Sequence, residues 1–238
     1  MTSQKIPVIE YLFLKYWNES DKKLRKTLMS MEDVKEGIIH CNEKYGTNLK
    51  TNNPANFLKD IIRKKSASKN WPISVTERRY TAIQRTGSGD VFEFIPFKPD
   101  QTEAFPDKFA PTSTTPIIPI QSISIPLVSK TLGRKDEPWL IQTAVNLKIV
   151  ESHFAITSKH EITELSHLQM SVKIKNTEID ALFLGTIQIK KKKDTAIITC
   201  EAKQYDERIL EDQIISQVKS AFSSIKPNIV IPIALSAI

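Results

Sequence analysis

Two apolar segments in the second half of the chain decide its fold: Glu178-Ile179-Asp180-Ala181-Leu182-Phe183-Leu184 and Thr195-Ala196-Ile197-Ile198-Thr199-Cys200-Glu201-Ala202-Lys203. The first is apolar beyond its start, which predicts a central strand that begins with a carboxylate. In the second, alternate residues are small or apolar, so a period of two places Glu201 and Lys203 together on the opposite face. We therefore expect two neighbouring strands that bring Asp180 close to Glu201 and Lys203.

Two carboxylates and a lysine in this arrangement suit the hydrolysis of phosphodiester bonds. That reaction needs hard divalent cations held by oxygen ligands, an activated water and neutralisation of the phosphate charge. Asp180 and Glu201 are candidate Mg²⁺ ligands, and Lys203 is a candidate to orient the water or stabilise the transition state. The alternative is a salt bridge between Glu201 and Lys203 on an exposed sheet face, but the apolar character of the strands argues against it.

The elements expected around these strands follow a definite order. A helix over Asp136–Phe154 and a strand over Leu168–Lys175 precede them; a helix over Asp206–Ile225 and a strand over Asn228–Leu235 follow. This αβββαβ succession, with Ile179-Asp180 and Glu201-Ala202-Lys203 as its motif residues, resembles the PD-(D/E)XK nuclease superfamily. The resemblance implies a mixed sheet, Mg²⁺ held by Asp180 and Glu201, and a lysine that assists the attacking water. Ile179 stands where the name of the family has proline.

A further acid from the first helix often joins such a site, and two residues are candidates. On an ideal helix, the side chain of Glu151 points within about 20° of the direction of Leu140, so Glu151 lies on the apolar side of the predicted helix. Glu137 lies near the same face. A carboxylate aimed at a core needs a partner, a metal or a proton. We expect Glu151 to be the fourth catalytic residue and keep Glu137 as the reserve.

The amino-terminal part predicts three helices and a hairpin. The first helix covers Ile6–Trp17, the second is capped by Ser30 and ends at Gly46, and the third covers Pro54–Lys65 with Asn53 as its cap. Two β-prone segments, Arg78–Gln84 and Asp90–Ile95, flank a Gly-rich turn and predict the hairpin. This order resembles a winged-helix domain.

The third helix and the wing would supply the contacts to DNA. One side of that helix is apolar, and the other carries cations and asparagines, which suits a helix in a major groove with a hairpin touching phosphates. The alternative is an ordinary solvated helix face. The candidate contact residues are Asn52, Asn53, Asn56, Lys59, Arg63, Lys64, Lys65, Lys69, Arg78 and Arg79.

The composition and charge of the chain restrict the class of protein and its partners. The 238 residues are 40% hydrophobic and 26% charged, as in a folded protein. The 34 Lys and Arg against 27 acids give a net charge of +7, which favours a polyanionic partner.

A Pro- and Thr-rich stretch predicts a linker over residues 99–119. It would separate a winged-helix-like α+β domain (1–98) from a nuclease domain (120–238), and the expected fold class of the whole chain is α/β. Two cysteines, no secretory pattern and apolar runs far below about 20 residues predict a reducing, cytoplasmic setting without membrane association.

A winged-helix-like domain joined to a PD-(D/E)XK-like unit resembles a type II restriction endonuclease of a restriction–modification system, and this resemblance implies a Mg²⁺-dependent endonuclease that acts on double-stranded DNA in a prokaryotic cell. Cutting both strands with one site per chain favours a two-fold homodimer. The alternatives are a DNA-repair or junction-resolving nuclease, and a non-catalytic DNA-binding protein with a degenerate nuclease fold.

Overall fold

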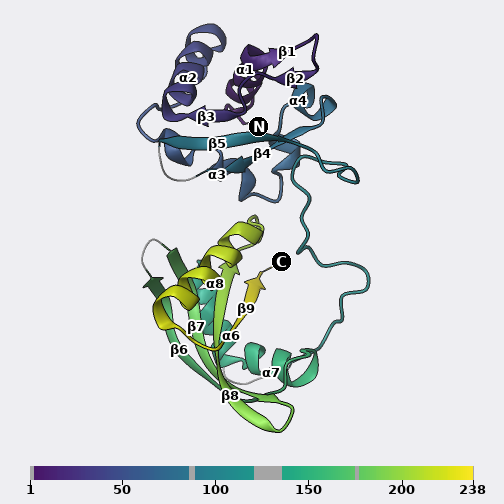
Figure 1. The fold of residues 1–238 in the computed structure, drawn as a ribbon, viewed down its shortest axis with the longest axis vertical. Coiled ribbons are helices and arrows are strands. Elements are labelled where there is room, and N and C mark those ends of the chain that lie inside the picture. The colour runs from purple at the N-terminus through teal and green to yellow at the C-terminus, as the bar shows by residue number, and fades with distance from the viewer. Residues whose placement is uncertain (1–2, 86–88, 121–135, 175–176, 238) are drawn as a thin grey trace. The chain divides into compact units, whose positions relative to one another are not determined.

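The structure is a computed structural model that describes residues 3–85, 89–120, 136–174 and 177–237 (Figure 1). The chain forms two compact units, Met1–Lys108 and Phe109–Ile238, which are described separately below as unit 1 and unit 2. The division falls inside the stretch that the sequence marks as a linker. Within the described residues, no helix is both long and apolar enough to cross a membrane.

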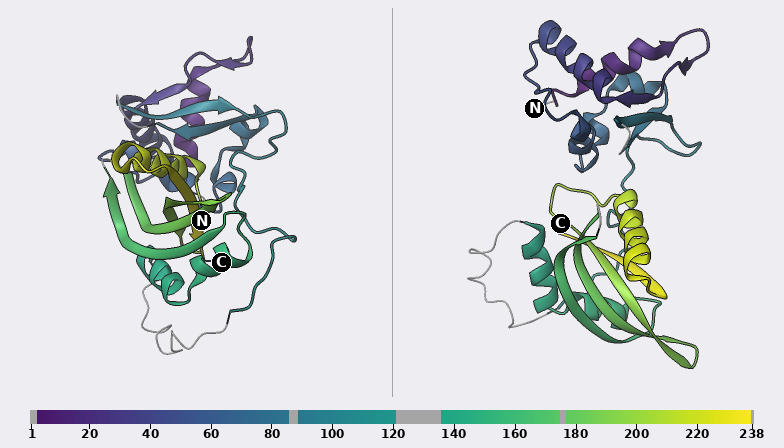
Figure 2. Two further views of the ribbon diagram at one scale, coloured as in Figure 1. Left: turned by 60° about the horizontal axis from the view of Figure 1, so that its bottom comes forward. Right: turned by 60° about the vertical axis from the view of Figure 1, so that its left-hand side comes forward.

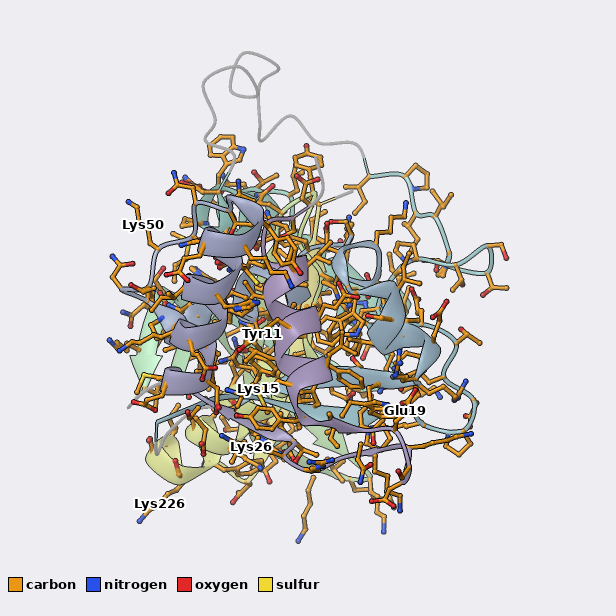
Figure 3. The ribbon with its side chains drawn as sticks, turned by 90° about the horizontal axis from the view of Figure 1, so that it is seen from above. Tyr11, Lys15, Glu19, Lys26, Lys50 and Lys226 are labelled. Atoms are coloured by element: carbon orange, nitrogen blue, oxygen red, sulfur yellow. The ribbon has the colours of Figure 1, made fainter. Side chains whose placement is uncertain are left out.

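Unit 1 begins with two packed helices, α1 (Ile6–Tyr16) and α2 (Met31–Tyr45). Both agree with the helices that the sequence predicts. Ser30 caps α2 through a reciprocal pair of hydrogen bonds with Asp33, and Gly46 ends it at φ 65°, a left-handed conformation that glycine adopts without strain. Tyr11 and Lys15, both labelled in Figure 3, belong to α1, and their side chains bind the carboxylate of Glu36 on α2.

A three-stranded antiparallel sheet completes unit 1. The predicted hairpin is present as β4 (Tyr80–Gln84) and β5 (Asp90–Pro96), and β3 (Leu28–Ser30) pairs with the free side of β5, giving the order β3-β5-β4. Residues 86–88 of the predicted turn lie outside the described part. Two short strands, β1 (Trp17–Asn18) and β2 (Lys23–Leu24), and a short helix, α4 (Ile73–Glu77), fill the connections.

The predicted third helix is broken. It consists of a 3₁₀ turn η1 (Pro54–Asn56) and a single turn α3 (Lys59–Ile62), and a second 3₁₀ turn η2 (Ser68–Asn70) follows. Asn53 does not cap the segment with its side chain. The apolar residues are nevertheless buried, and among them are the adjacent pairs Phe57-Leu58 and Ile61-Ile62. These four residues lie on one side of an ideal helix, so their burial agrees with the predicted apolar side, although the helix itself is short and interrupted.

Unit 2 contains a four-stranded mixed sheet, as the sequence predicts. Its strands are β6 (Ile162–Ile174), β7 (Thr177–Ile189), β8 (Lys192–Lys203) and β9 (Ile229–Ser236), in that order across the sheet. β6 is antiparallel to β7 and β7 is antiparallel to β8, whereas β9 runs parallel to β8. Helix α8 (Glu211–Ile225) connects β8 to β9.

Helices cover both faces of this sheet (Figure 2). On one face, Ala196, Ile198 and Cys200 of β8 pack with residues of α6 (Glu137–Asn146) and α7 (Ile149–Ile156). On the other face, Glu201 of β8 contacts Gln217 of α8. Because β8 is covered on both sides, Glu201 and Lys203 at its end are each only 3% exposed.

Three sequence predictions for unit 2 need correction. The single helix over 136–154 is two helices, because Lys148 adopts φ 55° between α6 and α7. Strand β6 begins at Ile162 rather than at Leu168 and lies at the edge of the sheet, where Leu168 is 49% exposed. Helix α8 begins at Glu211 rather than at Asp206, and its residue Phe222 is 44% exposed.

Candidate active site

The pairing of β7 with β8 brings the predicted catalytic residues together. Ala181 pairs with Cys200 in this antiparallel ladder, so Asp180, one residue earlier, lies beside Glu201. The Oδ2 atom of Asp180 accepts a hydrogen bond of 2.7 Å from the backbone N–H of Ala202. The Asp180 carboxylate of β7 is therefore hydrogen-bonded to the backbone of β8 at Ala202, the residue between Glu201 and Lys203.

Lys203 is the centre of the charge cluster. Its Nζ atom lies 2.7 Å from Oε1 of Glu201 and 2.7 Å from Oε1 of Glu137, and it donates a third bond of 3.0 Å to the carbonyl of Ala202. Burial alone would lower the pKa of Lys203, but the charge of Glu201 and the hydrogen bond to Glu137 hold that pKa above its ordinary value. Lys203 is therefore a fixed, permanently charged ammonium at neutral pH.

Gln217 is a site residue that sequence reasoning missed. Its Nε2 atom donates to Oε2 of Glu201 and, at 3.3 Å, to the carbonyl of Glu178. The side chain is 2% exposed. The sequence contained a signal for this role. Gln217 lies seven residues after Leu210, so a continuous helix would place both on the same side. A polar side chain that is buried on an apolar side requires a hydrogen-bond partner.

Asp180 carries the strongest sign of uncompensated negative charge. Burial, then the charge of Glu201 and, more weakly, that of Glu137 raise its pKa to about 7, against the lowering effects of the Ala202 N–H and Lys203. An ionised Asp180 is thus costly at neutral pH unless a further cation approaches. Perturbed carboxylates of this kind are common at functional sites.

The structure places Glu137, rather than Glu151, beside this cluster. Glu137 is the first residue of α6 and bonds Lys203 directly, whereas Glu151 on α7 pairs with Lys148 at 3.0 Å. The extrapolation along one ideal helix fails because the chain breaks at Lys148. Glu137, the reserve candidate, is therefore the acid of the helical segment that contacts Lys203.

The donor set fits a hard cation such as Mg²⁺. Among the described residues, no three His, Cys, Asp or Glu side chains form a group that could hold a metal ion alone. Mg²⁺, however, is usually held by one or two carboxylates and keeps several water ligands. Asp180, Glu201 and Glu137 against Lys203 leave two negative charges when all are ionised, and a divalent cation at Asp180 and Glu201 would balance them.

Five of the predicted DNA contacts gather around one pocket in unit 1. This pocket, which we call the unit 1 pocket, has a volume of about 390 Å³, and its predicted lining residues are Asn52, Asn53, Asn56, Lys59 and Arg63. Sequence reasoning missed two further cations, Lys5 and Lys50, which come from other segments. The cations and amides expected on a convex helix front therefore line a concavity.

The cations predicted next to the hairpin are engaged within the protein. Arg78 lies over the ring of Trp17 and donates to the carbonyl of Ser74. Arg79 donates to three backbone carbonyls, those of Lys98, Pro99 and Gln101. Their guanidinium groups therefore hold the fold of unit 1. Lys64, Lys65 and Lys69 are exposed and do not line the unit 1 pocket.

Comparison with known proteins gives little. No protein-family model and no curated protein matches this chain. Among solved structures, the DNA modification-dependent restriction endonuclease AspBHI is similar over 67% of this chain, with 10% sequence identity and a TM-score of 0.22. The alignment spans about half, 49%, of that enzyme's chain. A likeness of this size does not define a shared fold.

Proposed function

We propose that unit 2 is a Mg²⁺-dependent endonuclease that hydrolyses phosphodiester bonds in double-stranded DNA. The observation that carries this proposal is the cluster at the ends of β7 and β8: Asp180, with a pKa raised to about 7, lies beside a buried Glu201 that is paired with Lys203. The carboxylates of this cluster outnumber its one ammonium group, and the atoms that they offer to a cation are oxygens.

Each residue has a role that follows from its contacts. Asp180 and Glu201 would hold Mg²⁺, whose chemistry when bound is to neutralise phosphate charge and to make a water more acidic. Lys203, held by Glu201 and Glu137, presents a fixed ammonium that can orient the attacking water or stabilise charge on the phosphate. Gln217 holds the second oxygen of Glu201 and thereby its orientation.

The order of elements supports a PD-(D/E)XK assignment for unit 2. A helical segment, three antiparallel strands, a helix and a strand parallel to β8 follow one another, with the motif residues on β7 and β8. In unit 1, the order α1, β3, α2, α3, α4, β4, β5 of the main elements and the sheet order β3-β5-β4 support a winged-helix assignment, despite the broken third helix and the additional short helix α4. The pair of units suits a type II restriction endonuclease that acts as a homodimer.

The test is the nicking of supercoiled plasmid DNA in Mg²⁺ and in EDTA. The wild type should cut only in Mg²⁺, and Asp180→Asn should cut at least about 100-fold more slowly while binding DNA normally. Asp194→Asn is the matched control, because Asp194 lies near the opposite end of β8. Metal-independent cutting, or full activity of Asp180→Asn, would overturn the assignment.

A second candidate is a DNA-binding protein without catalysis. Both oxygens of Glu201 are engaged by Lys203 and Gln217, as in a purely structural ion pair. This candidate predicts salt-sensitive DNA binding and no cutting of linear, single-stranded or branched DNA in Mg²⁺. Cutting restricted to branched DNA would instead favour a repair or junction-resolving enzyme.

A further inference from the structure

The unit 1 pocket combines two kinds of recognition chemistry. Lys50, Lys59 and Arg63 provide positive charge, and Asn53 and Asn56 provide carboxamides that both donate and accept hydrogen bonds. The only acid in its lining, Asp60, is paired with Lys5 at 2.6 Å. The pocket is therefore cationic and suited to an anion that also carries hydrogen-bonding groups.

Several of these groups have unused hydrogen-bonding capacity. The Nε atom of Arg63 is buried and has no hydrogen-bond partner among the described residues, which is costly unless a ligand supplies an acceptor. Asn53 does not cap the following turn; its Oδ1 atom accepts a bond of 3.3 Å from Nδ2 of Asn56 instead. That bond leaves the Nδ2 group of Asn53 and the Oδ1 atom of Asn56 for a ligand.

The shape of the site argues against a helix lying in the major groove. The segment that carries Asn53 to Arg63 is a 3₁₀ turn and one helical turn, and its polar side chains surround a concavity of about 390 Å³. Pockets of roughly 300–1,000 Å³ typically enclose small ligands. Bases inside a stacked duplex cannot enter a concavity, whereas a nucleotide outside the stack can.

We propose that the unit 1 pocket binds a single nucleotide that has left the base stack of DNA. Its phosphate lies against Lys50, Lys59 and Arg63, and the edge of its base lies against Asn53 and Asn56. Leu49, which also lines the pocket, provides an apolar contact for the base or the sugar. The choice of DNA as the source of the nucleotide rests on the proposed function of unit 2; the pocket chemistry itself calls for a nucleotide.

Binding of two fluorescent duplexes to the full chain tests this proposal. One duplex is fully paired and the other has a single unpaired adenine, whose N6 and N7 atoms suit an asparagine carboxamide. Anisotropy is measured in EDTA, so that no cutting occurs. The wild type should bind the bulged duplex at least about tenfold more tightly, as expected for one or two added charge-assisted hydrogen bonds.

Variants of the pocket separate it from general attraction to DNA. The double variant Asn53→Ala/Asn56→Ala should lose the preference for the bulged duplex but bind the paired duplex as before. Lys50→Glu should weaken binding of the bulged duplex about tenfold or more. Lys44→Glu, the same charge change at an exposed position on α2, should reduce the preference less than twofold. Circular dichroism verifies that each variant is folded.

The outcomes distinguish this inference from the proposed function. Equal affinity for both duplexes in the wild type, or a preference that survives in Asn53→Ala/Asn56→Ala, would overturn the pocket assignment even if the chain cuts DNA. A preference for the bulged duplex without cutting would retain the pocket and reject the nuclease. Competition by free dAMP would identify a pocket that takes free nucleotides; preference without competition would identify one that requires the strand.

Discussion

The ammonium of Lys203 lies 2.7 Å from Oε1 of Glu201, and neither side chain is more than 4% exposed. A buried ion pair requires good geometry and further hydrogen bonds, because removing two charges from water is expensive. Here the further partners are Glu137, the carbonyl of Ala202 and Gln217.

Loss of the ammonium should destabilise unit 2. Lys203→Met leaves a buried, uncompensated Glu201 and should lower the free energy of unfolding by about 3–5 kcal/mol in urea titrations. The double variant Glu201→Gln/Lys203→Met should recover part of this loss, because no isolated charge remains. Lys193→Met is the control on the same strand: its pair with Glu164 is exposed, so the change should stay below about 1 kcal/mol.

The pKa of Asp180 predicts a pH dependence of stability in EDTA. The folded chain keeps the proton of Asp180 up to a pH of about 7, whereas the unfolded chain releases it near 3.8. Stability from this group is therefore lost as the pH rises through that window and is level above it. Asp180→Asn should be more stable than the wild type by about 1–3 kcal/mol at pH 8, with little difference at pH 4.

Urea titrations from pH 4 to pH 8 measure this difference. Asp194→Asn should not reproduce the trend, since it changes the same residue type near the opposite end of β8. A constant difference between Asp180→Asn and the wild type across the range would contradict the raised pKa.

The two acids of the helical segment should differ in their effect on cutting. Glu137→Gln weakens the hold on Lys203 and should reduce the rate of plasmid nicking by about 10–100-fold, as is typical for residues that orient a site group. Glu151→Gln, the same change on α7, should reduce it no more than about twofold. The reverse order of effects would restore Glu151 as the fourth residue of the site.

Gln217 should act by positioning Glu201. Gln217→Leu keeps a similar volume but removes the donor to Oε2 of Glu201, so kcat should fall by about tenfold with little change in KM. Gln213→Leu, one turn earlier on α8, is the matched control and should leave both constants near the wild-type values. A rise in KM alone would indicate that Gln217 contacts the DNA instead.

The break between α6 and α7 should respond to glycine. Lys148 adopts φ 55°, which costs a non-glycine residue energy, so Lys148→Gly should stabilise the chain by about 0.5–1 kcal/mol. Lys148→Ala loses the same ion pair with Glu151 without that relief, and it should be neutral or slightly destabilising in thermal unfolding. Equal effects of the two variants would argue for a continuous helix.

The local pattern of residues was enough to predict most elements. Period-two alternation placed β8, and the Ser30 cap with Gly46 bounded α2, because these signals act over a few residues and do not depend on the rest of the fold. The same pattern placed Glu201 and Lys203 on one face. Their proximity to Asp180 could be expected, because consecutive strands usually pair.

Only the tertiary structure decided which distant groups complete each site. Glu137 contacts Lys203 whereas Glu151 pairs with Lys148, and Gln217 contacts Glu201 through the packing of α8 on the sheet. The unit 1 pocket likewise combines Asn53, Asn56 and Arg63 of the interrupted third helix with Lys5 and Leu49 from other segments, a grouping that periodicity within one element does not predict. Sequence periodicity reports the direction of side chains within one regular element; contacts between elements, and the points where an element breaks, are set by packing that involves the whole unit.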